Sequence, residues 1–455
     1  MSNTRHEIKS SIKLFLPLFC SQLVYAISTF IGTAMIARLG EKHLAGLAIG
    51  SITYTTLCVF FFGIFVGIGI LVAENEGAKN HSRTNNIISQ GVILAVICTF
   101  FFVGVMLVAP KIFVFLGQDQ ETIEISSIYL SSLSLSILPW LLCVVFEQFL
   151  IGLSKTKLVM IISIIQVPLE IFINYTLVFG KFGFPEFGVA GLGYGFTATF
   201  VLSLIAFGIL SEKHKDIKKH NILGDFFSCR FELLKKLAKT GLPVGAINII
   251  ENLFFLVMTF LIGIVGIKNL AAQQIIRQYV ELVVTLGLSL TQATTIRASL
   301  AYGENNFSTL STAIRANMSI IVFLMFFILV VYSLFSNILI SMDIDVLNKE
   351  NKEIIDILSR VFILVGVFQL IDGVRLVAIG ALRSLHDNVV PMWITVAIFW
   401  LVSLPLGYYF CFIENLQLFG MWLGVLIGML VGTIIVLLRL KVILNRQMIS
   451  AKRHV

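Results

Sequence analysis

Two acidic residues, Glu251 and Asp372, lie inside long apolar stretches in the second half of the chain. A charged side chain at the centre of a bilayer costs at least ~2.5 kcal/mol, so an acid at such a position usually faces a polar cavity and serves a function there. Burial away from water also lets a proton, a metal cation and an organic cation compete for one carboxylate. Glu251 and Asp372 are therefore the first candidates for an ion-exchange site.

The chain carries an internal repeat. Residues 17–40 align without a gap with residues 243–266 at an offset of 226, and further matches follow in order until Phe187-Gly188 pairs with Phe419-Gly420 at an offset of 232. An ordered series of this kind is the signature of a duplicated unit.

We therefore predict two halves, residues 1–225 and 226–455, joined by a polar cytoplasmic linker at about 212–240. The positions that match Glu251 and Asp372 in the first half are Tyr25 and Val144. The ion site is thus expected in the second half.

The composition places the chain in a membrane. Hydrophobic residues make up 58% and charged residues 13% of the 455 residues, whereas soluble domains carry roughly a quarter charged residues. Apolar runs long enough to cross about 30 Å of hydrocarbon recur twelve times, with cores near residues 13–38, 45–73, 85–109, 123–151, 157–179, 189–210, 242–265, 270–299, 310–335, 354–380, 390–412 and 419–443. We predict an all-α membrane protein of about 12 transmembrane helices in two six-helix bundles.

The basic residues predict the orientation. If the N-terminus lies inside, 21 of the 33 Lys and Arg residues fall on the cytoplasmic side, as the positive-inside rule requires. Both termini are then cytoplasmic, and the location is the cell (inner) membrane. The net charge of +8 follows from this topology and from anionic lipid, so it is no argument for a nucleic acid partner.

The chain has no metalloprotease, nucleophile-elbow or nucleotide-binding motif, and its Cys and His residues lack metal-ligand spacing. We therefore expect no enzyme and no cofactor. Uphill transport would have to be driven by an ion gradient.

Two motifs carry a resemblance to a known family. Residues 380–391, GALRSLHDNVVP, resemble the G-x-L-R-G-x-x-D-x-x-x-P signature of multidrug and toxic compound extrusion (MATE) transporters, and residues 293–297, ATTIR, resemble their A-T-x-x-R element. The chain looks closest to the bacterial NorM-like branch, which places acids where this sequence has Glu251 and Asp372.

The resemblance implies two bundles around a central cavity that opens to one side at a time, and the export of organic cations and aromatic drugs in exchange for H⁺ or Na⁺. We accordingly expect a secondary active multidrug efflux antiporter, a monomer in the lipid bilayer. A Na⁺ site at Glu251 and Asp372 stays open. The family's tyrosine hydroxyl and first-helix acid are replaced here by Phe368 and Gly32, which favours H⁺.

The first half has acids of its own. Glu170 and Asn174 share a helix face four residues apart, so Glu170 is a second candidate for ion coupling, with Thr197 or Thr199 as neighbours. Glu147 is interpreted as a gate or a charge that reaches the membrane surface.

A drug cavity would combine these acids with aromatic and thioether side chains, which tolerate varied cations. The candidate substrate-binding residues are Tyr25, Phe254, Phe255, Met258, Gln274, Arg277, Tyr279, Phe368 and Trp400. A competing interpretation makes the acids structural, paired with Arg277, Arg297 or Arg375.

A second function stays open, namely the flipping of lipid-linked sugars or other anionic lipids. Lipid flipping predicts several Lys or Arg side chains lining the cavity in both halves. The membrane helices of the first half lack buried Lys and Arg, whereas Arg277 and Arg375 in the second half favour it. Uptake by symport is a further alternative, because the sequence does not reveal direction.

Overall fold

The computed structural model describes residues 2–115, 117–218, 230–345, 348 and 351–453. Within these ranges the chain is almost entirely helical and forms no strand. The helices of the first half are α1 (Ser2–Ala37), α2 (Glu41–Gly77), α3 (His81–Phe115), α4 (Gln120–Ser134), α5 (Ile137–Gly152), α6 (Thr156–Phe179), α7 (Ala190–Lys213) and the short α8 (Lys215–Lys218). Those of the second half are α9 (Phe231–Val265), α10 (Ile267–Gly303), α11 (Phe307–Leu334), α12 (Ser336–Asp343), α13 (Lys352–Ser384), α14 (Val389–Val396), α15 (Leu404–Tyr408) and α16 (Gln417–Arg453).

The predicted membrane spans are confirmed. Eleven helices of the described part are long and apolar enough to cross a bilayer, and α4 and α5 together make a twelfth that bends by 51°. The span that begins with α14 continues through two π-helical segments, η2 (Ala397–Ser403) and η3 (Tyr409–Ile413). Such local widening of a helix is common near functional sites.

The backbone repeats as the sequence does. Gly40 and Gly266, which precede α2 and α10, both have positive φ, at 117° and 147°. Positive φ also recurs at Lys79 and Asn305, where the offset is again 226. Both follow a helix end, and in both cases the next residue donates its N–H to a carbonyl five positions back, at 2.8 and 3.0 Å. These are equivalent left-handed helix caps.

The chain forms two compact units whose ends differ from the predicted halves. The N-terminal unit comprises Leu16–Gly245, and the C-terminal unit comprises Met1–Phe15 together with Ala246–Val455. The predicted boundary lay at residue 225. The difference arises because α1 and α9 are continuous helices that each belong to both units.

In the N-terminal unit, α2 packs against α3, α4 and α5, while α6 packs against α7. The first turns of α9 lie on α2, where Gly241 approaches the backbone of Ile64 so closely that a Cβ would lie 1.9 Å from the Ile64 carbonyl oxygen. Val66, Ile70 and Val244 form a small apolar core there.

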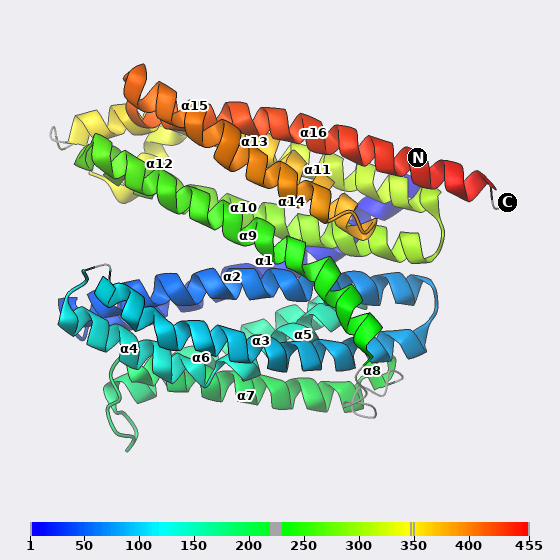
Figure 1. The fold of residues 1–455 in the computed structure, drawn as a ribbon, viewed down its shortest axis with the longest axis horizontal. Helices are drawn as coiled ribbons and strands as arrows, with labels where there is room; N and C mark the ends of the chain where they lie inside the picture. Colours follow the sequence, from blue (N-terminus) through cyan, green and yellow to red (C-terminus); the bar gives the residue numbers. More distant parts are fainter. Residues whose placement is uncertain (1, 116, 219–229, 346–347, 349–350, 454–455) are drawn as a thin grey trace. The chain divides into compact units, whose positions relative to one another are not determined.

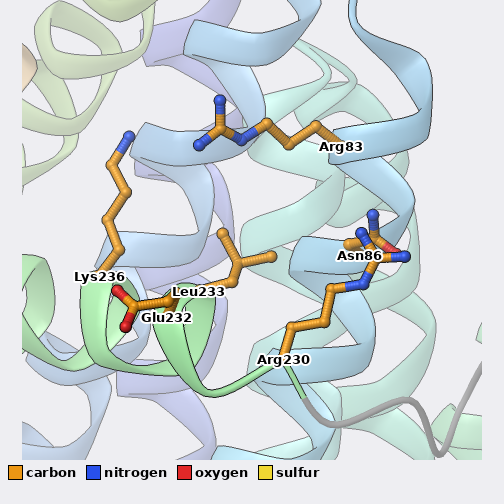
Figure 2. A pocket seen from close by; sticks show the side chains of 6 residues that line it. All are labelled: Arg83, Asn86, Arg230, Glu232, Leu233 and Lys236. Atoms are coloured by element: carbon orange, nitrogen blue, oxygen red, sulfur yellow. The ribbon is translucent and has the colours of Figure 1, made fainter.

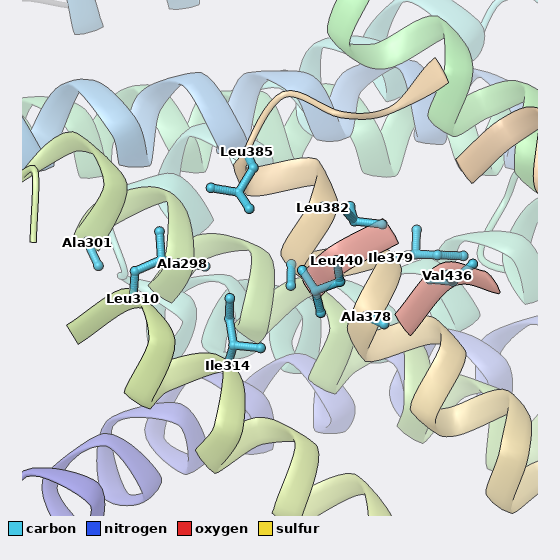
Figure 3. Close-up of a cluster of buried hydrophobic side chains, with 11 residues drawn as sticks. Ala298, Ala301, Leu310, Ile314, Ala378, Ile379, Leu382, Leu385, Val436 and Leu440 are labelled. Atoms are coloured by element: carbon cyan, nitrogen blue, oxygen red, sulfur yellow. The ribbon is translucent and has the colours of Figure 1, made fainter. Parts of the chain in front are cut away.

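In the C-terminal unit, α13 is the central helix and packs against α10, α11 and α16. The long helices run side by side (Figure 1). At one end of the unit small and aliphatic side chains interlock (Figure 3), namely Ala298, Ala301, Leu310, Ile314, Ala378, Ile379, Ala381, Leu382, Leu385, Val436 and Leu440. This packing fixes the register of α13, the helix that carries Asp372.

Candidate functional site

Glu251 and Asp372 come together in the C-terminal unit, joined by Arg375. Glu251 lies on α9, and the other two residues lie one turn apart on α13. The Arg375 Nη2 atom is 2.9 Å from Glu251 Oε1 and 2.7 Å from Asp372 Oδ1, and its Nε donates to Asp372 Oδ1 at 2.8 Å. Two carboxylates therefore share one guanidinium.

Arg375 and Asp372 are buried, whereas the Glu251 side chain is partly exposed. Arg375 is 1% exposed, and its guanidinium also lies 5.6 Å from the ring centre of Phe399. Ions removed from water are stable only when their partners are well placed. Arg383, also buried, acts on Glu251 through its field, but no ion pair joins the two. The geometry therefore matches the alternative in which an arginine of the same helix face pairs with the acids.

Glu170 in the N-terminal unit has a different environment. It lies on α6, is 3% exposed, and accepts a hydrogen bond from the Ser28 hydroxyl of α1. Gln166 lies one turn earlier on α6, but its Nε2 donates to no acceptor in the described structure. Among the described residues no cation lies within ion-pair distance of Glu170. Its charge is thus offset only by a neutral hydrogen-bond donor.

Asn174, the second predicted residue on this face, is 2% exposed, and its Oδ1 has no hydrogen-bond partner in the described structure. Gly195 of α7 makes the room for it, because a Cβ there would lie 1.9 Å from that oxygen. The Thr197 and Thr199 hydroxyls instead donate to carbonyls of their own helix, at 2.8 Å.

Glu147 on α5 accepts a 3.0 Å hydrogen bond from the Tyr25 hydroxyl of α1. Ser163 and Gln166 of α6 lie within 3.5 Å of the same hydroxyl. Tyr25 was predicted as a substrate contact, and the structure places its hydroxyl on Glu147. Tyr25, Glu147, Ser163 and Gln166 thus form one polar group over α1, α5 and α6. This group and the Ser28–Glu170 pair, which lies one turn further along α1 and α6, are hereafter called the N-unit network.

Three of the predicted substrate residues, Phe254, Met258 and Phe368, are fully buried in this structure. Phe254 packs on Phe399 with ring centres 4.8 Å apart, and Phe368 packs on Trp422 at 5.4 Å. Their side chains stabilise the C-terminal unit in this conformation.

The other predicted substrate residues of this unit are partly exposed or exposed. The Arg277 guanidinium lies 5.1 Å from the ring centre of Phe255, and it pairs with Glu281 rather than with Glu251 or Asp372. Gln274 is exposed and Trp400 is half-buried.

Tyr279 lies apart from this group. Its hydroxyl lies 2.9 Å from Leu339 O and 2.8 Å from Asp343 Oδ2, with one proton to share between these two acceptors, so it joins α10 to α12.

Two residues of the family motifs, Arg297 and Asp387, form ion pairs that connect helices. Arg297 binds both oxygens of Glu7 at 2.7 Å, and Asp387 accepts from Arg439 Nε at 2.7 Å. The first pair fixes the start of α1 on α10, and the second ties the loop after α13 to α16.

Ser28, Ser163 and Gln166 were missed as site residues. Helical spacing held a signal for two of them, because Ser28 follows Tyr25 by three residues and Gln166 precedes Glu170 by four. Their meeting across helices could not be read from spacing within either helix.

Comparison with known proteins places the chain among transporters. The MatE family model matches residues 17–176 and 243–409. The chain is 27% identical to a protein of Listeria innocua named probable multidrug resistance protein NorM, over 98% of this chain and 96% of the relative. It is 28% identical to a protein of that name from Geobacillus kaustophilus, over 95% and 94%.

Solved structures share the fold. An outward-facing MATE transporter of the MOP superfamily superposes with a TM-score of 0.86 at 19% identity, covering 97% of this chain and 96% of that one. A MOP superfamily transporter from Pyrococcus furiosus, described as having a binding pocket of reverse polarity, gives 0.85 at 18% identity, with the same coverage.

Proposed function

Because the chain belongs to the MatE family, we propose that it is a secondary active multidrug efflux antiporter, which exports organic cations and other xenobiotics in exchange for H⁺ by alternating access. The names of the NorM relatives support the substrate class. The excess of Lys and Arg in alternate loops supports cytoplasmic termini and the cell membrane as its place.

The observation that carries the coupling proposal is the isolation of Glu170. Burial without a cationic partner disfavours the ionised form of a carboxylate. Glu170 has hydroxyl and amide neighbours and, within the described chain, no cation. A group of this kind binds a proton from one side of the membrane and releases it when hydration changes. We assign proton binding to Glu170, with Asn174 lining the same face of α6.

Glu251 and Asp372 take the other part of the exchange. They already hold Arg375 as an internal cation, so an organic cation must compete with that guanidinium for the carboxylates. Phe255, which carries Arg277 over its ring, offers an aromatic face for such a cation. Because Arg375 competes for the same carboxylates, the organic cation is bound weakly enough to be released and exchanged.

The test is export of a fluorescent organic cation from proteoliposomes, with a pH gradient and a Na⁺ gradient imposed separately. We expect the pH gradient to drive export, Glu170→Gln to lower the rate at least tenfold, and Glu251→Gln and Asp372→Asn to weaken cation binding. Glu124→Gln, an exposed acid on α4, is the matched control. Wild-type export rates in Glu170→Gln under both gradients would refute the coupling role of Glu170. Export driven by the Na⁺ gradient alone would show that the coupling ion is Na⁺ and not H⁺.

Lipid flipping is the second candidate, favoured by the arginines of the C-terminal unit. Arg375 and Arg277 are, however, already paired with acids, so Arg383 is the one buried arginine of this unit without an ion pair among the described residues that could hold a lipid phosphate. Accelerated flipping of a fluorescent anionic lipid in the same vesicles, without export of the organic cation, would favour this function instead.

A further inference from the structure

A basic cavity of about 380 Å³ lies in the N-terminal unit where the first turns of α3 and α9 meet (Figure 2). The residues that line it are Arg83 and Asn86 of α3, and Arg230, Glu232, Leu233 and Lys236 at the start of α9. None of them belongs to the N-unit network or to the acids around Arg375. The proposed transport function therefore leaves this cavity without a role.

The lining carries an excess of positive charge, with three cations against one carboxylate. Within the described chain Arg83 and Arg230 form no ion pair, and Lys236 lies 3.6 Å from Glu74 in a partly exposed contact. Figure 2 shows the tips of Arg83 and Lys236 directed toward the same region from the two helices, with Arg230 beside Asn86. The cavity is thus positively charged.

The backbone adds to this charge. Arg83 lies in the first turn of α3, and Arg230 directly precedes α9. The first N–H groups of a helix lack intrahelical partners, and the helix dipole makes that end positive. The Arg230 N–H donates to Gln90 Oε1 at 3.0 Å, so the start of α9 is fixed on α3.

Asn86 supplies a further polar group. It is 6% exposed and lines the cavity, and its side chain makes no hydrogen bond to the described residues. The amide is accessible at the cavity wall, where a hydrogen-bonding ligand can reach it. A ligand oxygen in the cavity would satisfy its amide.

We propose that this cavity binds a phosphate group. Guanidinium groups hold phosphate oxygens through paired, charge-assisted hydrogen bonds, and two arginines and a lysine around one space suit a tetrahedral dianion or a phosphodiester. The phosphate can belong to a free anion or to an anionic phospholipid headgroup. The site does not depend on the transport proposal, and it joins the region after the inter-bundle linker to α3.

The test measures the thermal unfolding midpoint of the purified protein in lipid nanodiscs. One arm titrates inorganic phosphate against chloride at constant ionic strength in phosphatidylcholine discs, and the other raises the share of phosphatidylglycerol in phosphate-free buffer. We expect the wild-type midpoint to rise in at least one arm, and the responding arm identifies the source. Arg83→Gln and Arg230→Gln should weaken the apparent affinity at least tenfold.

Two further variants control for general charge and for misfolding. Lys235→Gln removes one charge from the exposed neighbour of Lys236, outside the cavity, and should bind as the wild type does. Glu232→Gln removes the only acid of the lining and should bind several-fold more tightly. No midpoint rise in the wild type, an equal loss in Lys235→Gln, or unchanged binding in Glu232→Gln would overturn the proposal.

Discussion

At the scale of single residues, the pairing of the acids distinguishes the two units. Glu251 and Asp372 share Arg375, whereas Glu170 and Glu147 each accept a hydrogen bond from a hydroxyl group. The first pair of acids thus faces a resident cation, and the second pair faces only uncharged donors. The two units therefore suit different parts of an exchange cycle.

Removing the Arg375 side chain should destabilise the protein, because Glu251 and Asp372 would lose the cation that balances their charge. We expect Arg375→Gln to lower the free energy of unfolding by about 3–5 kcal/mol, because breaking a buried ion pair leaves uncompensated charge. Chemical denaturation in detergent measures this loss. Adding Glu251→Gln or Asp372→Asn to the same chain should restore part of the stability.

The exposed Arg315 of α11 provides the matched control, since Arg315→Gln removes the same group from a hydrated position and should leave stability nearly unchanged. An Arg375→Gln protein as stable as the wild type would show that the network does not stabilise the fold.

At the scale of elements, glycines with positive φ set where the long helices begin. Gly40 has φ 117° and ψ 165°, and Gly266 has φ 147° and ψ 161°, a backbone region that is essentially confined to glycine. A Cβ at either position meets nothing within 4 Å. The constraint is therefore backbone conformation alone, which explains why the repeat keeps glycine at both sites.

Alanine at Gly40 should destabilise the protein by about 1–3 kcal/mol, the usual cost of holding such a conformation. Gly104→Ala is the counterpart within α3, where a Cβ also meets nothing within 4 Å, and it should stabilise the helix by about 0.5–1 kcal/mol. Thermal unfolding of both variants gives the comparison. Equal shifts of the same sign would contradict the backbone argument.

At the scale of the whole molecule, the two compact units are not simply the first and the second half of the chain. The start of α1 belongs to the C-terminal unit through Glu7, which binds Arg297 of α10, and the start of α9 belongs to the N-terminal unit through Lys236, which lies near Glu74 of α2. Because α1 matches α9 and α2 matches α10 in the repeat, both contacts join equivalent pairs of helices, although through residues at different positions. Each unit is completed by a segment that the chain position alone would assign to the other.

Breaking the contact of the first segment should weaken the C-terminal unit. Glu7→Gln leaves the Arg297 guanidinium without its carboxylate partner, and we expect a loss of about 3–5 kcal/mol in the free energy of unfolding. Hydrogen exchange along residues 2–15 should rise in the same variant. Lys9→Gln, at an exposed position of the same turn, serves as the control, and similar exchange in both variants would argue against an anchoring role for Glu7.

The sequence by itself determined the medium, the number of spans and the repeat, because hydropathy, charge and helical period are local properties. It also carried the family resemblance through residues 293–297 and 380–391, which the family match confirmed.

Only the tertiary structure decided which charge meets which. Arg375 was one of several arginines within reach, and nothing in the sequence indicated that Tyr25 would bind Glu147. Nor did residue spacing indicate that the start of α1 belongs to the C-terminal unit and the start of α9 to the N-terminal unit. These contacts join residues 122 or more positions apart. They depend on how helices pack against one another, and a period within one helix cannot encode that.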